Sequence, residues 1–185
     1  MMTELSLNVL DVAENSVRAD ASLVEITVSA DVVKDHLSIV IQDNGCGMTQ
    51  QQISQVTDPF FTSRTTRKVG LGVPFFKYAA ESAGGTFDIT STVGVGTTVR
   101  ATFVLSHIDR MPLGDMTSTI HNLIVYHAEI DFVYRYEYNE KSFTLDTREF
   151  REILGDVSLA EPEVSNYIKE FLTENKLETD GDALY

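Results

Sequence analysis

Apolar residues in the first hundred positions recur at two different intervals, and the change of interval predicts alternating helices and strands. Intervals of three and four, as in Val9, Val12 and Ala13, indicate a buried helical face. Alternation that ends in an apolar run, as in 36–43, indicates a strand. The predicted elements are helices at 3–19, 49–56 and 71–83 and strands at 23–30, 36–43, 86–91 and 97–106.

The second part of the chain carries further patterned segments. Residues 116–127 place apolar side chains on one helical face, and 130–138 alternate between large apolar or aromatic and mostly charged residues before turning into another strand. Two helices are expected next, the first capped by Asp146 or Thr147 and the second starting at a proline. The tyrosines of the alternating strand could form a docking face, but packing against these helices is the favoured interpretation.

The amino-acid composition restricts the class of protein. Hydrophobic residues make up 43% of the 185 residues, enough for one medium domain, alone or with a small appendage. The single Cys46 excludes an internal disulfide framework and suits a reducing compartment. No apolar run approaches the roughly 20 residues that span a bilayer, and the N-terminus lacks a signal-peptide pattern, so a cytoplasmic protein without membrane contact is expected.

The net charge of −14 is distributed unevenly. Residues 1–106 carry 11 acids and 7 bases, whereas 107–185 carry 17 acids and 7 bases. So acidic a chain without a visible basic patch should repel nucleic acid, which argues against a topoisomerase-like or repair role. Residues 174–182 are expected to form a solvated, disordered acidic tail.

Three polar residues lie beside the apolar stripe of the first helix. Asp11, Asn15 and Arg18 follow one another at spacings of four and three residues, which puts them on one helical face. A carboxylate, a carboxamide and a guanidinium there suit a hydrated magnesium ion and a triphosphate. The alternative is an ordinary solvated helix face, and the motifs downstream favour the binding site.

A turn rich in glycine follows the second strand. Asp43 stands at the strand end, where its carboxylate can accept a hydrogen bond from an exocyclic amine, and Gly45 and Gly47 allow a tight turn near a flat ring. An ordinary Asp-Asn-Gly turn is the alternative. Because a short helix follows instead of a return strand, the sequence favours Asp43 as an adenine-binding residue.

A second glycine pair, Gly70 and Gly72, opens the helix at 71–83. Such a start exposes unpaired N–H groups at the positive end of the helix dipole, which suits phosphate. No Gly-Lys-Ser/Thr follows, and the third glycine and leading strand of a Rossmann motif are missing. The preceding loop carries Arg64, Arg67 and Lys68, so it is either a mobile lid or a plain surface loop.

These elements together resemble the nucleotide site of the GHKL superfamily, which includes gyrase-type topoisomerases, heat-shock-90 chaperones, histidine kinases and mismatch-repair ATPases. The resemblance covers about 3–106 and is strongest with histidine kinases. It implies binding of ATP and Mg²⁺ by an α/β sandwich of the Bergerat type, a mostly antiparallel sheet with helices on one face. A small α+β appendage would follow, so the expected domains are 1–106 and 107–185.

The resemblance also implies roles for single residues. Asn15 matches the magnesium ligand, Arg18 stands where histidine kinases usually have a phosphate-binding lysine, and Asp43 matches the adenine-binding aspartate. The other nucleotide-site positions are Gly45 and Gly47 of the adenine motif, Phe60 and Arg64 in a stretch similar to Glu-Pro-Phe-Phe-Thr-Thr-Lys, Lys68 of the lid, Gly70, Leu71, Gly72 and Val73 of the second glycine box, and Thr97 in the Gly-x-Gly-Thr before the last strand.

Two departures from the family pattern bear on catalysis. Four residues before Asn15, gyrase-like and mismatch-repair ATPases place a water-activating glutamate and sensor kinases usually an asparagine, whereas this chain has Asp11. Asp11 is the candidate base, but its shorter side chain predicts slow hydrolysis. Glu14 points about 100° away from Asn15 around the helix and is not expected to be the base. No helical hairpin precedes the domain, so the phosphoacceptor module of sensor kinases is expected to be absent.

His107 begins a stretch that resembles a phosphoacceptor box. Residues 107–113 match His-Glu-Leu-Arg-Thr-Pro-Leu at His, Arg, Pro and Leu, but Ile108 replaces the acid expected after the histidine. The stretch also follows a strand instead of lying within a long helix. A linker histidine is therefore the favoured interpretation.

Three functional hypotheses follow. The first is a regulatory kinase or ATP-dependent switch that acts on a separate, unknown protein partner. The second is a slow, self-contained ATPase that cycles through lid closure and homodimerisation. The third is a nucleotide-sensing interaction module without chemistry. The sequence favours the first.

Overall fold

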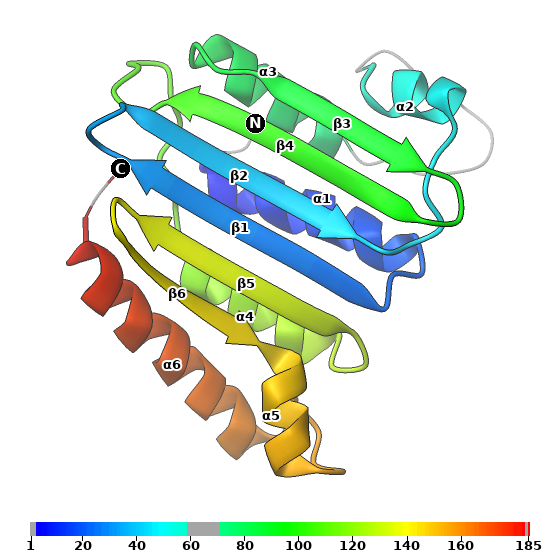
Figure 1. The fold of residues 1–185 in the computed structure, drawn as a ribbon, viewed down its shortest axis with the longest axis vertical. Coiled ribbons are helices and arrows are strands. Elements are labelled where there is room, and N and C mark those ends of the chain that lie inside the picture. The colour runs from blue at the N-terminus through cyan, green and yellow to red at the C-terminus, as the bar shows by residue number, and fades with distance from the viewer. Residues whose placement is uncertain (1–2, 59–70, 184) are drawn as a thin grey trace.

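The computed structural model describes residues 3–58, 71–183 and 185, and its centre is a mixed six-stranded sheet (Figure 1). The strands are ordered β3-β4-β2-β1-β5-β6. All neighbouring pairs are antiparallel except β1 and β5. The strands are β1 (Leu23–Asp31), β2 (His36–Asp43), β3 (Phe87–Thr92), β4 (Gly96–Val104), β5 (Asp131–Tyr138) and β6 (Lys141–Asp146).

Helices cover one face of this sheet, as Figure 1 shows for α1, α3 and α4 behind the strands. The alternating burial of β1 explains this arrangement, because Val24, Ile26 and Val28 are buried toward the helices while the residues between them face outward. The helices are α1 (Leu5–Arg18), α2 (Gln50–Val56), α3 (Gly72–Ser82), α4 (Met116–Tyr126), α5 (Thr147–Leu154) and α6 (Pro162–Asp180). The expected α/β sandwich is confirmed.

The C-terminal segment extends the same sheet. After β4, the chain passes through α4, which packs against α1, and returns as β5 parallel to β1. The β5–β6 hairpin predicted from the alternating residues is present, and β6 forms the edge. Helix α6 packs on α4 and on the inner side of the hairpin, where Tyr134 and Tyr136 are buried. The appendage is therefore continuous with the sheet that carries the first four strands.

The expectation of a disordered acidic tail was wrong. Helix α6 continues to Asp180, whose carboxylate accepts hydrogen bonds from the Tyr136 hydroxyl (2.6 Å) and from Lys176 Nζ (2.8 Å). Tyr136 on β5 and Lys176, one helical turn earlier on α6, compensate the free-energy cost of burying this charge. The local amino-acid composition does not reveal these partners. In the part of the chain that the structure describes, no helix combines the length and hydrophobicity required to cross a membrane.

Candidate functional site

Asp43, the last residue of β2, is held by three hydrogen-bond donors. Ser16 Oγ of α1 donates to Asp43 Oδ2 at 2.6 Å. The backbone N–H groups of Gly45 and Thr97 donate to Oδ1 at 2.9 and 3.2 Å. Since the donors come from a helix, the following turn and strand β4, the carboxylate has one defined orientation at the point where these elements meet.

A hollow of about 100 Å³ adjoins this carboxylate. Asn15, Asp43 and Thr97 are among its polar lining residues. Its apolar lining comes from three helices, the glycine turn and the sheet, through Val12, Met48, Val56, Val73, Ile89 and Val99. Apolar walls with a few fixed polar groups are typical of sites that bind a flat heterocycle.

The glycines of the turn allow close contact between backbones. Gly47 has a φ of +67°, and a Cβ added there would lie 2.0 Å from the carbonyl oxygen of Thr92. A Cβ at Gly45 would lie 2.7 Å from the carbonyl oxygen of Ala19. Both positions therefore require glycine, because the backbone of the turn packs directly against the end of α1 and the end of β3.

Of the three polar residues predicted on one face of α1, Asn15 lines the hollow, and Asp11 and Arg18 lie outside its lining. Arg18 Nη1 donates to Asn15 Oδ1 at 3.1 Å, so these two side chains form a pair on the helix surface. Glu14, by contrast, is hydrogen-bonded to His127 Nε2 at 2.8 Å, at the junction with α4. Glu14 is thus engaged away from the hollow, as expected from its angular position on the helix.

Asp11 lies against the start of α3. A Cβ built on Gly72 would be 2.6 Å from the Asp11 Cβ and 3.1 Å from its Oδ2, so the helix start and the carboxylate are in direct contact. Burial raises the pKa of Asp11; nearby Arg18 lowers it, and Glu14 raises it further. A carboxyl group with a raised pKa beside a helix N-terminus is a candidate proton acceptor.

Helix α3 begins with backbone donors that no side chain caps. Its N-cap residue, Leu71, makes no side-chain capping bond and is 45% exposed. Gly72 and Val73, the first two helical residues, are buried, and Val73 lines the hollow. Within the described residues no side chain caps these first-turn N–H groups, so they can donate to an anion at this end of the hollow.

The structure thus brings Asn15, Asp43, Gly47, Val73 and Thr97 together around one hollow. Phe60, Arg64, Lys68 and Gly70 lie outside the described residues, so the lid stays a prediction.

Sequence reasoning missed Ser16, the side-chain donor to Asp43. Its position four residues after the buried Val12 was the available signal, because a serine on the buried face of a helix requires a partner.

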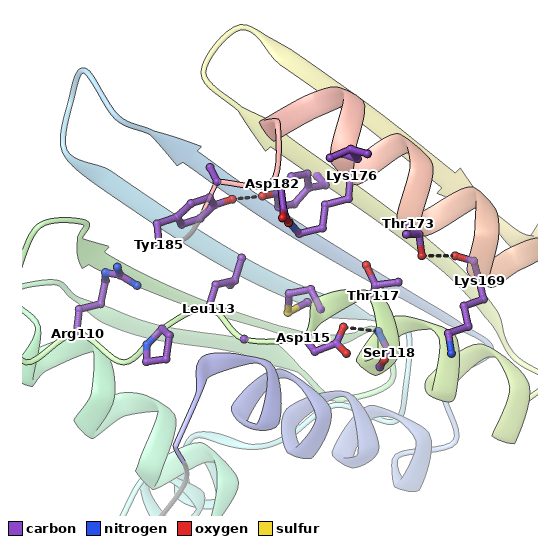
Figure 2. Close-up of a pocket in the computed structure, with 16 residues that line it drawn as sticks. Arg110, Leu113, Asp115, Thr117, Ser118, Lys169, Thr173, Lys176, Asp182 and Tyr185 are labelled. Carbon is purple, nitrogen blue, oxygen red and sulfur yellow. Dashed lines mark hydrogen bonds between the residues drawn. The ribbon is translucent and has the colours of Figure 1, made fainter.

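A larger hollow, of about 1010 Å³, lies between α4, α6 and the last described residues (Figure 2). Tyr185 and Lys176 lie on its wall, and Asp115 on its floor caps α4 by accepting from Ser118 N at 2.9 Å. Of the glycine and aspartate motifs, no residue that the structure describes lines this hollow. We therefore assign the candidate site to the smaller hollow beside Asp43.

Comparisons with known proteins identify the family of the chain. The family described as histidine kinase-, DNA gyrase B- and HSP90-like ATPase matches residues 2–107. A putative sensor protein of Shewanella frigidimarina is 34% identical over 85 residues, 45% of this chain and 13% of that protein. The sensor protein kinase GraS of Staphylococcus aureus is 27% identical over 92 residues, 46% of this chain and 27% of that one. The matches thus span at most about a quarter of these relatives.

A solved structure shares the fold. The N-terminal domain of a DNA repair protein superposes with a TM-score of 0.53 at 16% identity, covering 78% of this chain and 52% of that one. At this identity the likeness concerns the fold alone. Because the family match covers more than half of the chain and includes every motif of the site, the chain belongs to the histidine kinase-, DNA gyrase B- and HSP90-like ATPases and carries a histidine-kinase-like ATP-binding domain.

Proposed function

We propose that the hollow beside Asp43 binds the adenine of Mg-ATP and that the domain acts as a regulatory kinase or ATP-dependent switch on a separate protein. The observation that carries this proposal is the fixed orientation of the Asp43 carboxylate at the wall of an apolar hollow. A carboxylate held in this way can accept a hydrogen bond from the exocyclic N–H of adenine, and Met48 and Val73, which line the hollow, would pack against the ring.

The triphosphate would extend from the hollow toward the start of α3. The uncapped N–H groups at Leu71, Gly72 and Val73 would donate to its oxygens, and the helix dipole would add a partial positive charge. Arg18, at the outer end of α1, would supply a guanidinium to the phosphates once it releases Asn15. Phosphate binding and rearrangement of the Arg18–Asn15 pair are thus coupled.

The residues present fit a magnesium ion. Asn15 lines the hollow, and its carboxamide oxygen accepts only from Arg18 within the described part of the chain. Magnesium prefers oxygen ligands and keeps several waters, so one protein oxygen beside a triphosphate satisfies its requirements. The ion would neutralise charge on the phosphates, and Asn15 would orient it.

The short side chain of Asp11, the candidate base, supports action on a separate partner over rapid hydrolysis. Asp11 is one methylene shorter than the glutamate of the gyrase-like members, so water activation should be inefficient and ATP should persist long enough for transfer or signalling. The similarity to a sensor protein and to a sensor kinase supports this role.

A slow, self-contained ATPase is the second candidate, and one observation favours it. Asp11 touches Gly72 at the phosphate end of the site, and burial raises its pKa. A stronger base near the γ-phosphate could take a proton from water. This cycle would involve lid closure and a homodimer.

Incubation of the purified chain with γ-labelled ATP and magnesium separates the candidates. Binding with little free phosphate is expected for a switch or kinase, with label appearing on protein once the partner is added. Rapid release of labelled phosphate by the isolated chain would favour the ATPase. Absence of nucleotide binding by calorimetry would overturn both. The variant Asp43→Asn tests whether binding occurs in the proposed hollow. Asp88→Asn, on the exposed side of β3, makes the same chemical change elsewhere and is its matched control.

A further inference from the structure

Another hollow is lined by residues of α5, α6 and the edge strand β6. Figure 1 shows these elements at the end of the strand order opposite to β3 and β4, whose residues line the candidate nucleotide site. We call this hollow, of about 450 Å³, the α5–α6 groove. Its apolar lining from the two helices is Phe150, Ile153, Leu154, Val164, Tyr167 and Phe171, and β6 adds Leu145. Among the described residues, none from the nucleotide-binding motifs lines it, so it requires a separate explanation.

Aromatic contacts give the groove a defined shape. The Phe150 ring lies with its centroid 6.0 Å from those of Tyr167 and Phe171, at interplanar angles of 58° and 90°. Ile153 is nevertheless 85% exposed and Tyr167 58% exposed. A single exposed apolar residue needs no explanation, but two that line the same groove beside a packed aromatic floor indicate an interaction surface.

The groove has an acidic rim. Glu149 and Glu163 line it from α5 and α6, and neither forms an ion pair among the described residues. The nearby cations are already engaged: Arg148 pairs with Asp146 at 2.6 Å, and Arg151 binds an aspartate and two carbonyl groups around the start of β5. The rim therefore presents negative charge on either side of an apolar floor.

The dimensions of the groove suit a helix. Its lining residues on α6 run from Glu163 to Phe171, eight helical steps or about 12 Å along the helix axis. This length corresponds to two turns of a helix that offers apolar side chains at positions i, i+4 and i+7. The walls formed by α5 and α6 would hold such a segment along its apolar side.

The negative charge of the rim distinguishes between possible ligands of the groove. A second copy of the chain would bring the same acidic rim and a net charge of −14, so like charges would face each other. An anionic lipid surface and a nucleic acid would be repelled for the same reason. A segment with lysine or arginine around an apolar stripe has complementary charge.

We propose that the α5–α6 groove binds a cationic amphipathic helix of a partner protein. Apolar side chains of that helix enter between Phe150 and Val164 and cover Ile153 and Tyr167, and its basic residues pair with Glu149 and Glu163. The docking surface is separate from the ATP site, and its test is independent of nucleotide.

The test uses the full chain and fluorescently labelled model peptides. One peptide of leucine and lysine places all leucines on one helical face, a second has the same composition in shuffled order, and a third has glutamate in place of lysine. Fluorescence anisotropy without nucleotide is expected to show binding of the first peptide, with affinity at least about tenfold above that of the other two.

Substitutions in the groove locate the binding. Ile153→Ser and Tyr167→Ser remove exposed apolar contacts and are expected to weaken the first peptide about tenfold each, while circular dichroism and Mg-ATP affinity stay unchanged. The double variant Glu149→Gln, Glu163→Gln should weaken binding and reduce its dependence on salt. Glu152→Gln, on the exposed side of α5 outside the lining, is the matched control and should change affinity by less than about twofold.

The proposal is overturned if the shuffled peptide binds as well as the amphipathic one, or if Ile153→Ser and Tyr167→Ser both leave the affinity unchanged. It is also overturned if sedimentation shows a dimer of the wild type that Ile153→Ser dissociates, because a second copy would then cover the groove. Loss of nucleotide binding in Asp43→Asn with peptide binding intact would leave this inference standing.

Discussion

Ser16 on α1 donates a 2.6 Å hydrogen bond to Asp43 at the end of β2, and this bond joins the helix that carries Asn15 to the strand end that carries the proposed adenine acceptor. The two sides of the hollow are therefore oriented by the same contact. Substitution of Ser16, Asp43 or Asn15 should therefore change the affinity for nucleotide.

Ser16→Ala removes a donor from a partly buried carboxylate without introducing bulk. A hydrogen bond to a charged group contributes about 1.5–3 kcal/mol, but the two backbone donors still hold Asp43, so only part of this should be lost from binding and affinity for ATP should fall roughly two- to tenfold. Isothermal titration calorimetry measures this loss. Ser6→Ala, at the other end of the same helix, is the control, since the Ser6 hydroxyl donates to Glu4 instead of to Asp43 and its removal should leave ATP affinity unchanged.

Asp43→Asn has a larger expected effect, because it replaces an acceptor that faces adenine by a group whose NH₂ can face another donor. Loss of a hydrogen bond to a charged group costs roughly 1.5–3 kcal/mol, or about ten- to hundredfold in affinity. Calorimetry with ATP and ADP should show the same loss for both nucleotides. Unchanged affinity would mean that another residue reads the adenine.

Asn15→Ala tests the magnesium assignment. The variant should bind ATP more weakly when magnesium is present, whereas binding in EDTA should change little, because the lost oxygen serves the metal. Titrations with and without magnesium give the two affinities. Equal losses in both conditions would make Asn15 a structural residue.

Local periodicity predicted the N-terminal part of the fold because each element there has its own buried stripe. The predicted strand at 36–43 coincides with β2, and the predicted helix at 3–19 differs from α1 by two residues or fewer at each end. The parallel pairing of β5 with β1 could not be predicted in this way. Its determinants are contacts between residues about a hundred positions apart, which no local pattern records.

The same distinction applies to charged residues. Asp43 was predicted from its own turn, whereas the partner that orients it, Ser16, lies 27 residues earlier on another element. The acidic stretch near Asp180 was expected to be solvated because its neighbours in the sequence are charged. The Tyr136 hydroxyl, 44 residues earlier, stabilises that carboxylate inside the fold.

Asp11→Asn is expected to abolish the slow hydrolysis of ATP while leaving binding nearly intact, because the amide cannot accept a proton from water. A phosphate-release assay and calorimetry on the same preparation check both parts. In the wild type, the raised pKa of Asp11 should shift the acid limb of the pH–rate profile upward. Brisk hydrolysis that survives the substitution would identify another base.

The same substitution has a predicted effect on stability. Burial raises the pKa of Asp11 in the folded state, so the contribution of this group to stability is present below its unfolded pKa and is lost as pH rises through the folded value. Asp11→Asn should therefore raise the melting temperature at neutral pH but not at a pH below 3.8. Thermal unfolding of both proteins at the two pH values measures the difference.

His107 is expected not to be an autophosphorylation site, and its position in the fold supplies the reason. Thr97 of β4 pairs with Asp43, and the strand continues for seven further residues to Val104, about 23 Å at the rise of a strand, before His107 is reached. The histidine therefore lies at the other end of the sheet from the proposed adenine site.

The imidazole itself is also engaged. His107 Nδ1 accepts a hydrogen bond from the backbone N–H of Asp109 at 3.2 Å, and Ile108 stands where a phosphoacceptor box carries an acid. No carboxylate at that position can hold the ring during transfer. Incubation with γ-labelled ATP should leave wild type and His107→Ala equally free of acid-labile, base-stable phosphate. If such phosphate appears on the wild type and is absent from His107→Ala, the prediction is wrong and the protein is a compact histidine kinase. The distance between His107 and its own nucleotide site would then require phosphate transfer between two subunits.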